Sequence, residues 1–487
     1  MSTPVSTSSQ LPDLLQDARS FISDYLTPSV RLGVTGLSRS GKTVFITALV
    51  RNLTSGGRLP FFVPDAEGRI VRAYLEPQPD DAVPRFDYEA HMAHLEATPP
   101  RWPESTRRVS ELRVTIEYQS GSTLKRLFGL SKLHLDIVDY PGEWLIDLPL
   151  LAQSYAEFSR EALALARDPR RAERAKPLLD FLAGTDPAGA ADETIALNGA
   201  QLFTTYLRAC RDSESQSTLA PGRFLMPGDL DGSPLLTFFP MPLTVQSSPP
   251  RGSLAAMMMR RYESYKAQVV RPFFKDHFSR IDRQIVLVDV LGALGHGADA
   301  VRDLDRAMEG VLKAFRPGVN SWLSMIMGRR IEKVLFAATK ADHLPASSHD
   351  RLAAILALIV EQAAKRADTE GAGTAALALS ALRATRETMV KTGAETLPCL
   401  KGIPLAGERI GDHVYDGTEE AAIFPGDLPA DPRAALDAAR IAKTASFQLV
   451  RFEPPRLRAK SNDVATPALP HIRLDRALDF LLAEDLA

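Results

Sequence analysis

Val34–Ile46 reads VTGLSRSGKTVFI, and this stretch decides the fold class of the chain. Within it, GLSRSGKT (Gly36–Thr43) matches the pattern G-x-x-x-x-G-K-[ST] in full and lies between a β-branched run and a helical pattern. Consecutive backbone amides in such a loop form a nest for anions, and the start of the helix adds partial positive charge. The stretch therefore predicts a phosphate-binding loop between a strand and a helix, but it does not identify the base of the nucleotide.

Each residue of the predicted loop has an expected contact. Lys42 is expected to reach the β and γ phosphates, and the hydroxyl of Thr43 is expected to bind Mg²⁺. The other loop residues are expected to contact the nucleotide mainly through backbone amides: Leu37, Ser38, Arg39, Ser40, Gly41 and Val44. The side chain of Arg39 has two interpretations, contact with phosphate or exposure to solvent, and the sequence leaves both open.

Composition narrows the class of protein. The 487 residues are 24% charged and 45% hydrophobic with a formal net charge of -2, so no global charge favours nucleic acid or anionic lipid. No run of about 18 apolar residues and no secretory signal pattern occurs, which predicts a cytoplasmic protein that does not span a membrane. The two cysteines, Cys210 and Cys399, lack metal-binding spacing and fit a reducing compartment.

A second motif follows the alternating run KLHLDIVDY and reads DYPG at Asp139–Gly142. The carboxylate of Asp139 is placed to hold Mg²⁺ through water, and the backbone amide of Gly142 is placed near the γ-phosphate. A turn without a ligand has the same sequence, and VDVLG (Val288–Gly292) offers Asp289 as an alternative carboxylate. Because one further strand normally separates this motif from the base-reading segment, we favour Asp139 and interpret Asp289 as structural.

A third motif far downstream indicates the base. VLFAATKAD (Val334–Asp342) is a buried-strand pattern, and the carboxylate of Asp342 can accept hydrogen bonds from N1–H and the exocyclic amine of guanine. Adenine offers no such pair of donors, so a buried carboxylate discriminates strongly between the bases. The stem of Lys340 is expected to lie across the base. The next strand pattern, ALALSAL, ends in residues whose backbone amides are expected to contact the guanine oxygen: Ser380, Ala381 and Leu382.

The order of phosphate loop, DxxG, TKxD and SAL, each at a strand end, resembles that of Ras-like GTPases. With the stretches PGRF..PGDL and RQIVLVDVLGAL, the motifs resemble the YcjX family of bacterial P-loop proteins over nearly the whole chain. The resemblance implies a Ras-like GTP-binding core with large insertions and GTP or GDP with Mg²⁺ as cofactors. It also implies a membrane-protein partner and the phage-shock stress response, which would bring the protein to the inner face of the membrane.

Two expected positions carry no matching motif. The residue after the DxxG glycine, usually a glutamine in Ras-like proteins, is Glu143, which can accept a hydrogen bond from water but cannot donate one, so we expect slow intrinsic hydrolysis. For the switch I ligand of Mg²⁺ we choose Thr106, just before the strand ELRVTIEY, with Ser105 and Ser110 as alternatives. The expected catalytic residues are Lys42, Thr106, Gly142 and Glu143.

The hydrophobic patterns predict an α/β fold, with a mainly parallel sheet that has one antiparallel strand, a large helical insertion and a β-rich C-terminal extension. The runs ELRVTIEY and KLHLDIVDY are expected to pair antiparallel. The expected regions are an N-terminal tail and helix (1–28), the first half of the GTP-binding domain (29–147), a helical insertion (148–282), the second half of that domain (283–385) and an extension ending in a helix (386–487).

We therefore expect a Mg²⁺-dependent GTPase that works as a nucleotide-gated switch by hydrolysing the phosphoanhydride of GTP. The segments near Thr106 and Gly142 are expected to reorder with the γ-phosphate. Two alternatives stay open. One is a nucleotide-binding scaffold with little or no turnover, which Glu143 favours, and the other is a P-loop ATPase, which requires TKAD to be a coincidence.

Overall fold

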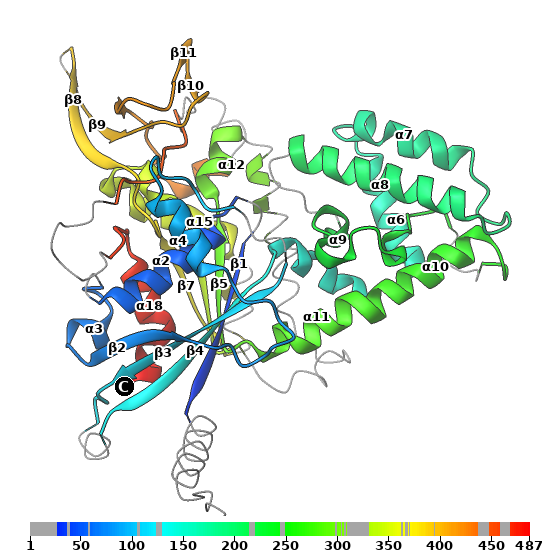
Figure 1. The fold of residues 1–487 in the computed structure, drawn as a ribbon. Coiled ribbons are helices and arrows are strands. Elements are labelled where there is room, and N and C mark those ends of the chain that lie inside the picture. Colours follow the sequence, from blue (N-terminus) through cyan, green and yellow to red (C-terminus); the bar gives the residue numbers. More distant parts are fainter. Residues whose placement is uncertain are drawn as a thin grey trace, which may run out of the picture.

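Parallel strands form the centre of the computed structural model, and a helical region and a small β-rich part extend from them (Figure 1). The described residues are 27–36, 39–56, 59–104, 108–122, 129–213, 220–243, 249–297, 300–302, 304–305, 308, 331–361, 364–365, 369, 371–393, 395–436, 448–457 and 468–487. The helix predicted within 1–28 falls outside these residues. In the described part, no helix is long and apolar enough to cross a membrane.

The central sheet contains seven strands in the described part of the chain, in the order β2-β3-β4-β1-β5-β6-β7. The strands are β1 (Ser29–Gly36), β2 (Ile70–Glu76), β3 (Ser110–Tyr118), β4 (Ser131–Asp139), β5 (Arg283–Val288), β6 (Lys333–Ala338) and β7 (Gly373–Ala378). Strand β3 runs antiparallel to both of its neighbours, and the other pairs are parallel. The predicted α/β fold with one antiparallel strand, a helical insertion and a β-rich C-terminal part is confirmed.

Both faces of the sheet are covered, which explains why its middle strands are almost continuously apolar. Every residue of β5 is buried, and its side chains alternate between two hydrophobic clusters, one on each face. One cluster contains Ile285 and Leu287 and includes α2 (Lys42–Ser55), α4 (Tyr88–Glu96) and α18 (Leu474–Leu482). The other contains Val286 and Val288 and includes α12 (Val290–His296), α15 (His349–Ile359) and the 3₁₀ helix η1 (Gly142–Ala152).

The helical region lies beside the second face of the sheet (Figure 1). Its elements are α6 (Tyr155–Ala166), α7 (Ala172–Ala183), α8 (Glu193–Ser213), α9 (Gly222–Leu225), α10 (Leu254–Tyr265), a π-helical turn (Lys266–Val270) and α11 (Arg271–Asp276). Helix α6 begins at a capping box in which Ser154 and Glu157 satisfy each other's backbone amides. Aromatic rings fill the core between the helices, and the ring of Phe158 lies 5.0 Å from that of Tyr262.

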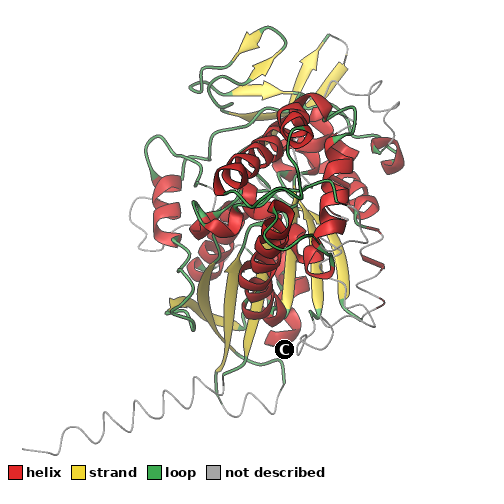
Figure 2. Cartoon of the chain, turned by 90° about the vertical axis from the view of Figure 1, so that its right-hand side faces the viewer, coloured by secondary structure: helices red, strands yellow, loops and turns green. Residues whose placement is uncertain are grey.

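The predicted C-terminal extension has two parts of different character. Its first part contains small sheets, seen at the top of Figure 2, that consist of β8 (Arg386–Thr392), β9 (Glu395–Gly402), β10 (Arg409–Ile410), β11 (His413–Val414) and β12 (Ala421–Ile423). The chain then returns to the central sheet, where the backbone of Ile472 pairs with that of Ser380 and the amide of Leu469 donates to Asn52 Oδ1 at 3.0 Å. Helix α18 follows and packs in the same cluster as α2.

Short helical turns complete the described structure. They are α3 (Val63–Ala66) and the 3₁₀ turns Gly228–Leu230, Pro234–Leu236, Phe278–Arg280, Ala341–His343, Ala346–Ser348, Pro432–Ala435 and Ala483–Leu486.

The packing of α18 predicts that the end of the chain is a structural part of the central domain. Leu481 is fully buried against the sheet, so Leu481→Ala should lower the free energy of unfolding by about 2–5 kcal/mol through lost burial and a cavity. The matched control is Leu197→Ala, since Leu197 is half exposed on the helical region. Urea denaturation followed by circular dichroism measures both changes, and equal small effects in the two variants would contradict the docking of α18.

Candidate functional site

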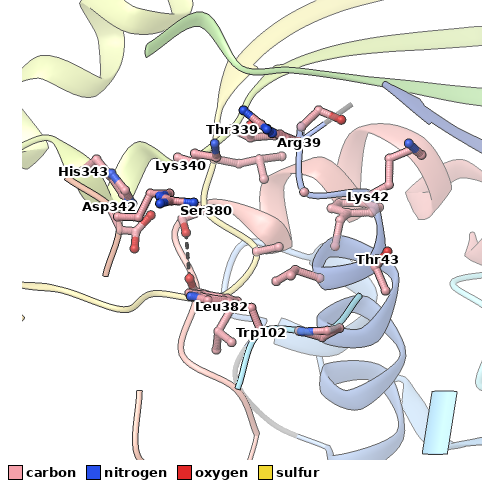
Figure 3. Close-up of a pocket in the computed structure, with 18 of the residues that line it drawn as sticks. Arg39, Lys42, Thr43, Trp102, Thr339, Lys340, Asp342, His343, Ser380 and Leu382 are labelled. Atoms are coloured by element: carbon pink, nitrogen blue, oxygen red, sulfur yellow. Dashed lines mark hydrogen bonds between the residues drawn. The ribbon is translucent and has the colours of Figure 1, made fainter. Parts of the chain in front are cut away.

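A cavity of about 400 Å³ lies where the carboxyl ends of β1, β6 and β7 meet (Figure 3). Its size is in the range of small-molecule sites. Most of the site residues predicted from the sequence line it: Arg39, Ser40, Gly41, Lys42, Thr43, Val44, Glu143, Lys340, Asp342, Ser380, Ala381 and Leu382. Lys42 and Thr43 lie at one side of the cavity, and Asp342 and His343 lie at the other. We call these sides the phosphate end and the base end.

The predicted phosphate loop connects β1 to α2 through a tight turn. A Cβ at Gly36 would overlap Ser40 Oγ and the Leu287 carbonyl, so glycine allows the loop to pass close to β5. Gly41 has a φ of 86° and immediately precedes α2, whose first residue is Lys42. The Lys42 ammonium donates to the Gly36 carbonyl at 3.1 Å, which holds the side chain over the loop. The first turn of α2 therefore lines the cavity beside a cation, and its backbone amides carry the partial positive charge of a helix start.

The second predicted motif lies deeper than the cavity wall. Asp139 ends β4 opposite Val34 of β1 and Ser110 of β3, and it is almost fully buried. Glu143 lines the cavity and is only 4% exposed. Asp139 and Gly142 are not among the described residues that line the cavity.

Some predicted contacts cannot be placed. The predicted contacts of Leu37, Ser38 and Thr106, and the alternative at Ser105, lie outside the described residues. Ser110, the other alternative to Thr106, is buried and directly opposite Asp139 in the antiparallel register. Arg39 lines the cavity and is exposed, so both of its interpretations stay open.

Asp289, the alternative carboxylate in the sequence, caps a helix. Its Oδ1 accepts a hydrogen bond from the Gly292 amide at 2.9 Å at the start of α12. Its Oδ2 forms an ion pair with the ammonium of Lys340. Lys340 has a φ of 60° and lines the cavity, so the ion pair fixes the far end of a side chain that borders the base end.

Asp342 is held in place by the segment that follows β7. Its Oδ2 accepts a hydrogen bond from the Ala384 amide at 2.9 Å, and its backbone carbonyl accepts one from the Thr385 hydroxyl. The side chain is 4% exposed, so its orientation depends on these contacts. Ser380 Oγ donates to the Leu382 carbonyl at 3.0 Å, as the dashed line in Figure 3 shows. The base end is therefore a rigid pair of loops that carries one buried carboxylate.

Further residues that line the cavity carry no sequence motif. Trp102 Nε1 donates to the Phe452 carbonyl at 2.7 Å, and both residues line the cavity together with Leu405 and Arg451 of the C-terminal part. Phe452 also meets the ring of His343 edge to face at 5.4 Å. Burial lowers the pKa of His343, which favours the neutral imidazole. A tryptophan after a Pro-rich segment was the one local signal available for this part of the site.

The lining of the cavity also includes a residue of the helical region. Met226, which follows α9, lines the cavity together with Glu143. Its carbonyl accepts a hydrogen bond from Trp144 Nε1 at 3.2 Å. The helical region and the C-terminal part therefore each contribute side chains to one cavity.

Comparisons with known proteins agree with this geometry. The model of the YcjX-like family, DUF463, matches residues 30–486. A protein of Escherichia coli (strain K12) named Ras-like GTPase YcjX is 38% identical over 467 residues, which cover 94% of this chain and 96% of that protein. The Ras-like GTPase YcjX of Shewanella oneidensis is 33% identical over 498 residues, with 98% of each chain covered. The chain belongs to the YcjX-like family.

Proposed function

We propose that the protein binds guanine nucleotides in this cavity and hydrolyses GTP. The observation that carries the proposal is the presence of the phosphate loop and of the buried carboxylate of Asp342 at opposite ends of a single cavity. The names of the two relatives, both called Ras-like GTPases, support the same activity. Both ends are needed for this assignment. A phosphate loop alone accepts any nucleotide, and a buried carboxylate alone shows only that a ligand with a matching pair of donors would fit.

The base end supports guanine over adenine. The Ala384 amide donates a hydrogen bond to Oδ2 of Asp342 and orients the carboxylate. The carboxylate can accept hydrogen bonds from N1–H and the exocyclic amine of guanine. Adenine would leave this buried carboxylate without those donors, at a cost of about 1–3 kcal/mol or more. Trp102, Leu382 and Phe452 supply apolar surface for a flat base in the same cavity.

The phosphate end supports a magnesium site of the phosphate-loop kind. Thr43 lines the cavity at the start of α2, and Asp139 lies at the end of the strand that pairs with β1. The described residues contain no cluster of three or more His, Cys, Asp or Glu side chains that could hold a metal by themselves. A site with only one hydroxyl and one carboxylate from the protein, Thr43 and Asp139, fits Mg²⁺, which keeps several waters and takes phosphate oxygens as ligands. Bound there, Mg²⁺ would neutralise charge on the phosphates.

Lys42, the amides that begin α2 and Glu143 have different roles in the proposed hydrolysis. Lys42 places positive charge on the β and γ phosphates, and the amides that begin α2 face the same anion. The carboxylate of Glu143 can accept a hydrogen bond from the attacking water and orient it, but it cannot donate one back. Turnover is therefore slow in this proposal, and a scaffold that binds nucleotide without cleaving it is the second candidate that Glu143 favours.

The cellular part of the proposal rests on the family resemblance. It includes a stress-response role and a membrane-protein partner at the inner face of the membrane. We also propose that 148–282 is the helical insertion between the two halves of the GTP-binding domain, 29–147 and 283–385, and that 386–487 forms the C-terminal extension.

Replacing the base-reading carboxylate tests the nucleotide specificity. Asp342→Asn should lower the affinity for GDP by about 100-fold, because the amide cannot accept from both guanine donors, and should raise the relative affinity for xanthine nucleotides. Titration with fluorescent nucleotides measures both effects. Asp180→Asn is the control, since Asp180 is exposed on α7. Unchanged GDP affinity in Asp342→Asn would contradict the assignment of Asp342.

Single-turnover phosphate release separates the GTPase from the scaffold. With Mg²⁺ and excess protein, the wild type should release phosphate slowly, and Glu143→Ala should be at least tenfold slower with unchanged GTP affinity. Lys42→Ala should lose nucleotide binding, and Glu173→Ala, at an exposed position of α7, should match the wild type. Phosphate release by the wild type no faster than by Lys42→Ala would establish the scaffold instead.

Trp102 provides a test of base binding at a residue that no motif suggested. Trp102→Ala should weaken GDP binding about tenfold or more, because stacking of a base on an aromatic ring contributes about 1–3 kcal/mol. Trp102→Phe, which keeps an aromatic face and loses the hydrogen bond to the Phe452 carbonyl, should retain most of the affinity. Equal affinity of Trp102→Ala and the wild type would exclude a contact between Trp102 and the base.

A further inference from the structure

The segment that carries Glu143 is held by the helical region. Glu143 is the second residue of η1, which is buried along most of its length. The far end of η1 is tied to α10 and the turn after it, because the Tyr262 hydroxyl donates to the Leu150 carbonyl at 3.2 Å and the Lys266 ammonium donates to the Gln153 carbonyl at 2.8 Å. The near end, beside the cavity, is held by α9.

Asp147 connects η1 to two helices of this region. Its Oδ1 accepts from the Gly222 amide at 2.6 Å, and its Oδ2 accepts from the Tyr265 hydroxyl at 2.5 Å and the Arg223 amide at 3.3 Å. Burial raises the pKa of Asp147 to about 6, although these donors oppose the rise. These three hydrogen bonds to one buried carboxylate hold both α9 and α10 against η1.

Gly222 brings α9 into direct contact with the catalytic segment. A Cβ at this position would overlap the carbonyl oxygen of Glu143, so the close approach requires glycine. The guanidinium carbon of the next residue, Arg223, lies 3.1 Å from the centroid of the Trp144 ring. The same turn ends at Met226, which lines the cavity and accepts from Trp144 Nε1. The turn formed by residues 222–226 therefore contacts the backbone of Glu143 and the side chain of Trp144, and it also lines the cavity.

We propose that Asp147 and Gly222 are positioning residues for hydrolysis, which hold α9 against the Glu143 peptide and so fix the Glu143 carboxylate relative to the phosphate end. The inference rests on the proposed GTPase function. The residues proposed to hold GDP lie on the phosphate loop, on α2, on the loops after β6 and β7 and at Trp102 and Phe452, outside this contact. Loosening the contact should therefore slow the chemical step and leave nucleotide affinity unchanged, which gives the helical region control over turnover.

Paired variants test this separation. Tyr265→Phe removes one donor to Asp147, and its control, Tyr155→Phe, removes an equally buried hydroxyl that donates to the Phe239 carbonyl at 2.6 Å inside the helical region. Gly222→Ala forces α9 away from Glu143. Its control is Gly184→Ala, because the nearest atom to an added Cβ there, the Phe181 carbonyl oxygen, is 3.8 Å away.

The expected result is a difference between rate and affinity. Tyr265→Phe and Gly222→Ala should lower the single-turnover rate of GTP hydrolysis at least tenfold, because a shift of about 1 Å at a catalytic group costs up to about 100-fold. Their affinities for GDP should stay within about twofold of the wild type, and both controls should keep the wild-type rate. Should Gly222→Ala fail to fold, Tyr265→Phe with its control still decides the question.

The pH dependence provides a second readout. The groups that face Asp147 are Tyr265 and Tyr262 from α10 and Arg223 from α9. Burial raises the pKa of both tyrosines, and arginine stays charged, so Asp147 is the member of this cluster that titrates near pH 6. Protonation removes an acceptor, so the wild-type rate should fall as the pH drops through about 6. Asp147→Asn should be slow and should lack this fall.

Each alternative outcome is decisive. If Tyr265→Phe and Gly222→Ala hydrolyse GTP as fast as their controls, the positioning role is overturned and the proposed GTPase function stands. If their GDP affinity falls together with the rate, the contact serves nucleotide binding and the inference is also overturned. If the wild type shows no hydrolysis, the proposed function and this inference are overturned together.

Discussion

The register of four parallel strands determines where the candidate site lies. Gly36 of β1 is opposite Leu287 of β5, which is opposite Ala337 of β6, which is opposite Leu377 of β7. Because these strands end within one residue of this row, the loops that follow β1, β6 and β7 meet at one edge of the sheet. The phosphate loop, the Asp342 turn and the Ser380 segment thus come together although they are far apart in the sequence. A shift of one residue in this register would turn the apolar side chains of a strand to the wrong face.

The large additions to this sheet meet its site from two sides. The helical region contributes Met226 to the lining of the cavity, and the C-terminal part contributes Phe452. Each is attached by specific polar contacts, one through Asp147 and one through the hydrogen bond from Trp102 to the Phe452 carbonyl. Movement of either part would therefore change the walls of the cavity, and a partner that binds either part would have a direct route to the nucleotide.

The sequence predicted the parts of the site that depend on local structure. At the phosphate loop a strand, a glycine loop and a helix follow one another, so the motif and its geometry form one local unit. The same holds for β6 and the turn after it that carries Asp342. The antiparallel pairing of β3 with β4 was also predicted, because both strands show alternation and are separated by a short connection. These features need no knowledge of distant contacts.

Contacts between distant segments could not be predicted in this way. Nothing in the sequence around Phe452 indicates that its carbonyl accepts from Trp102, and no local pattern shows that Gly222 lies against the Glu143 peptide. The C-terminal helix was predicted, but its position in the same cluster as α2 joins distant segments, as does the hydrogen bond from the Leu469 amide to Asn52, 417 residues away. Such contacts are set by packing between elements, and a single sequence carries no period or spacing that reports them.

The central claim is that one cavity reads guanine at Asp342 and binds phosphates at Lys42. The most direct measurement is calorimetric titration of the nucleotide-free protein with GTP and with ATP, in the presence of Mg²⁺. We expect GTP to bind at least about 100-fold more tightly than ATP, because adenine leaves the buried carboxylate unpaired. Equal affinity for the two nucleotides would contradict it.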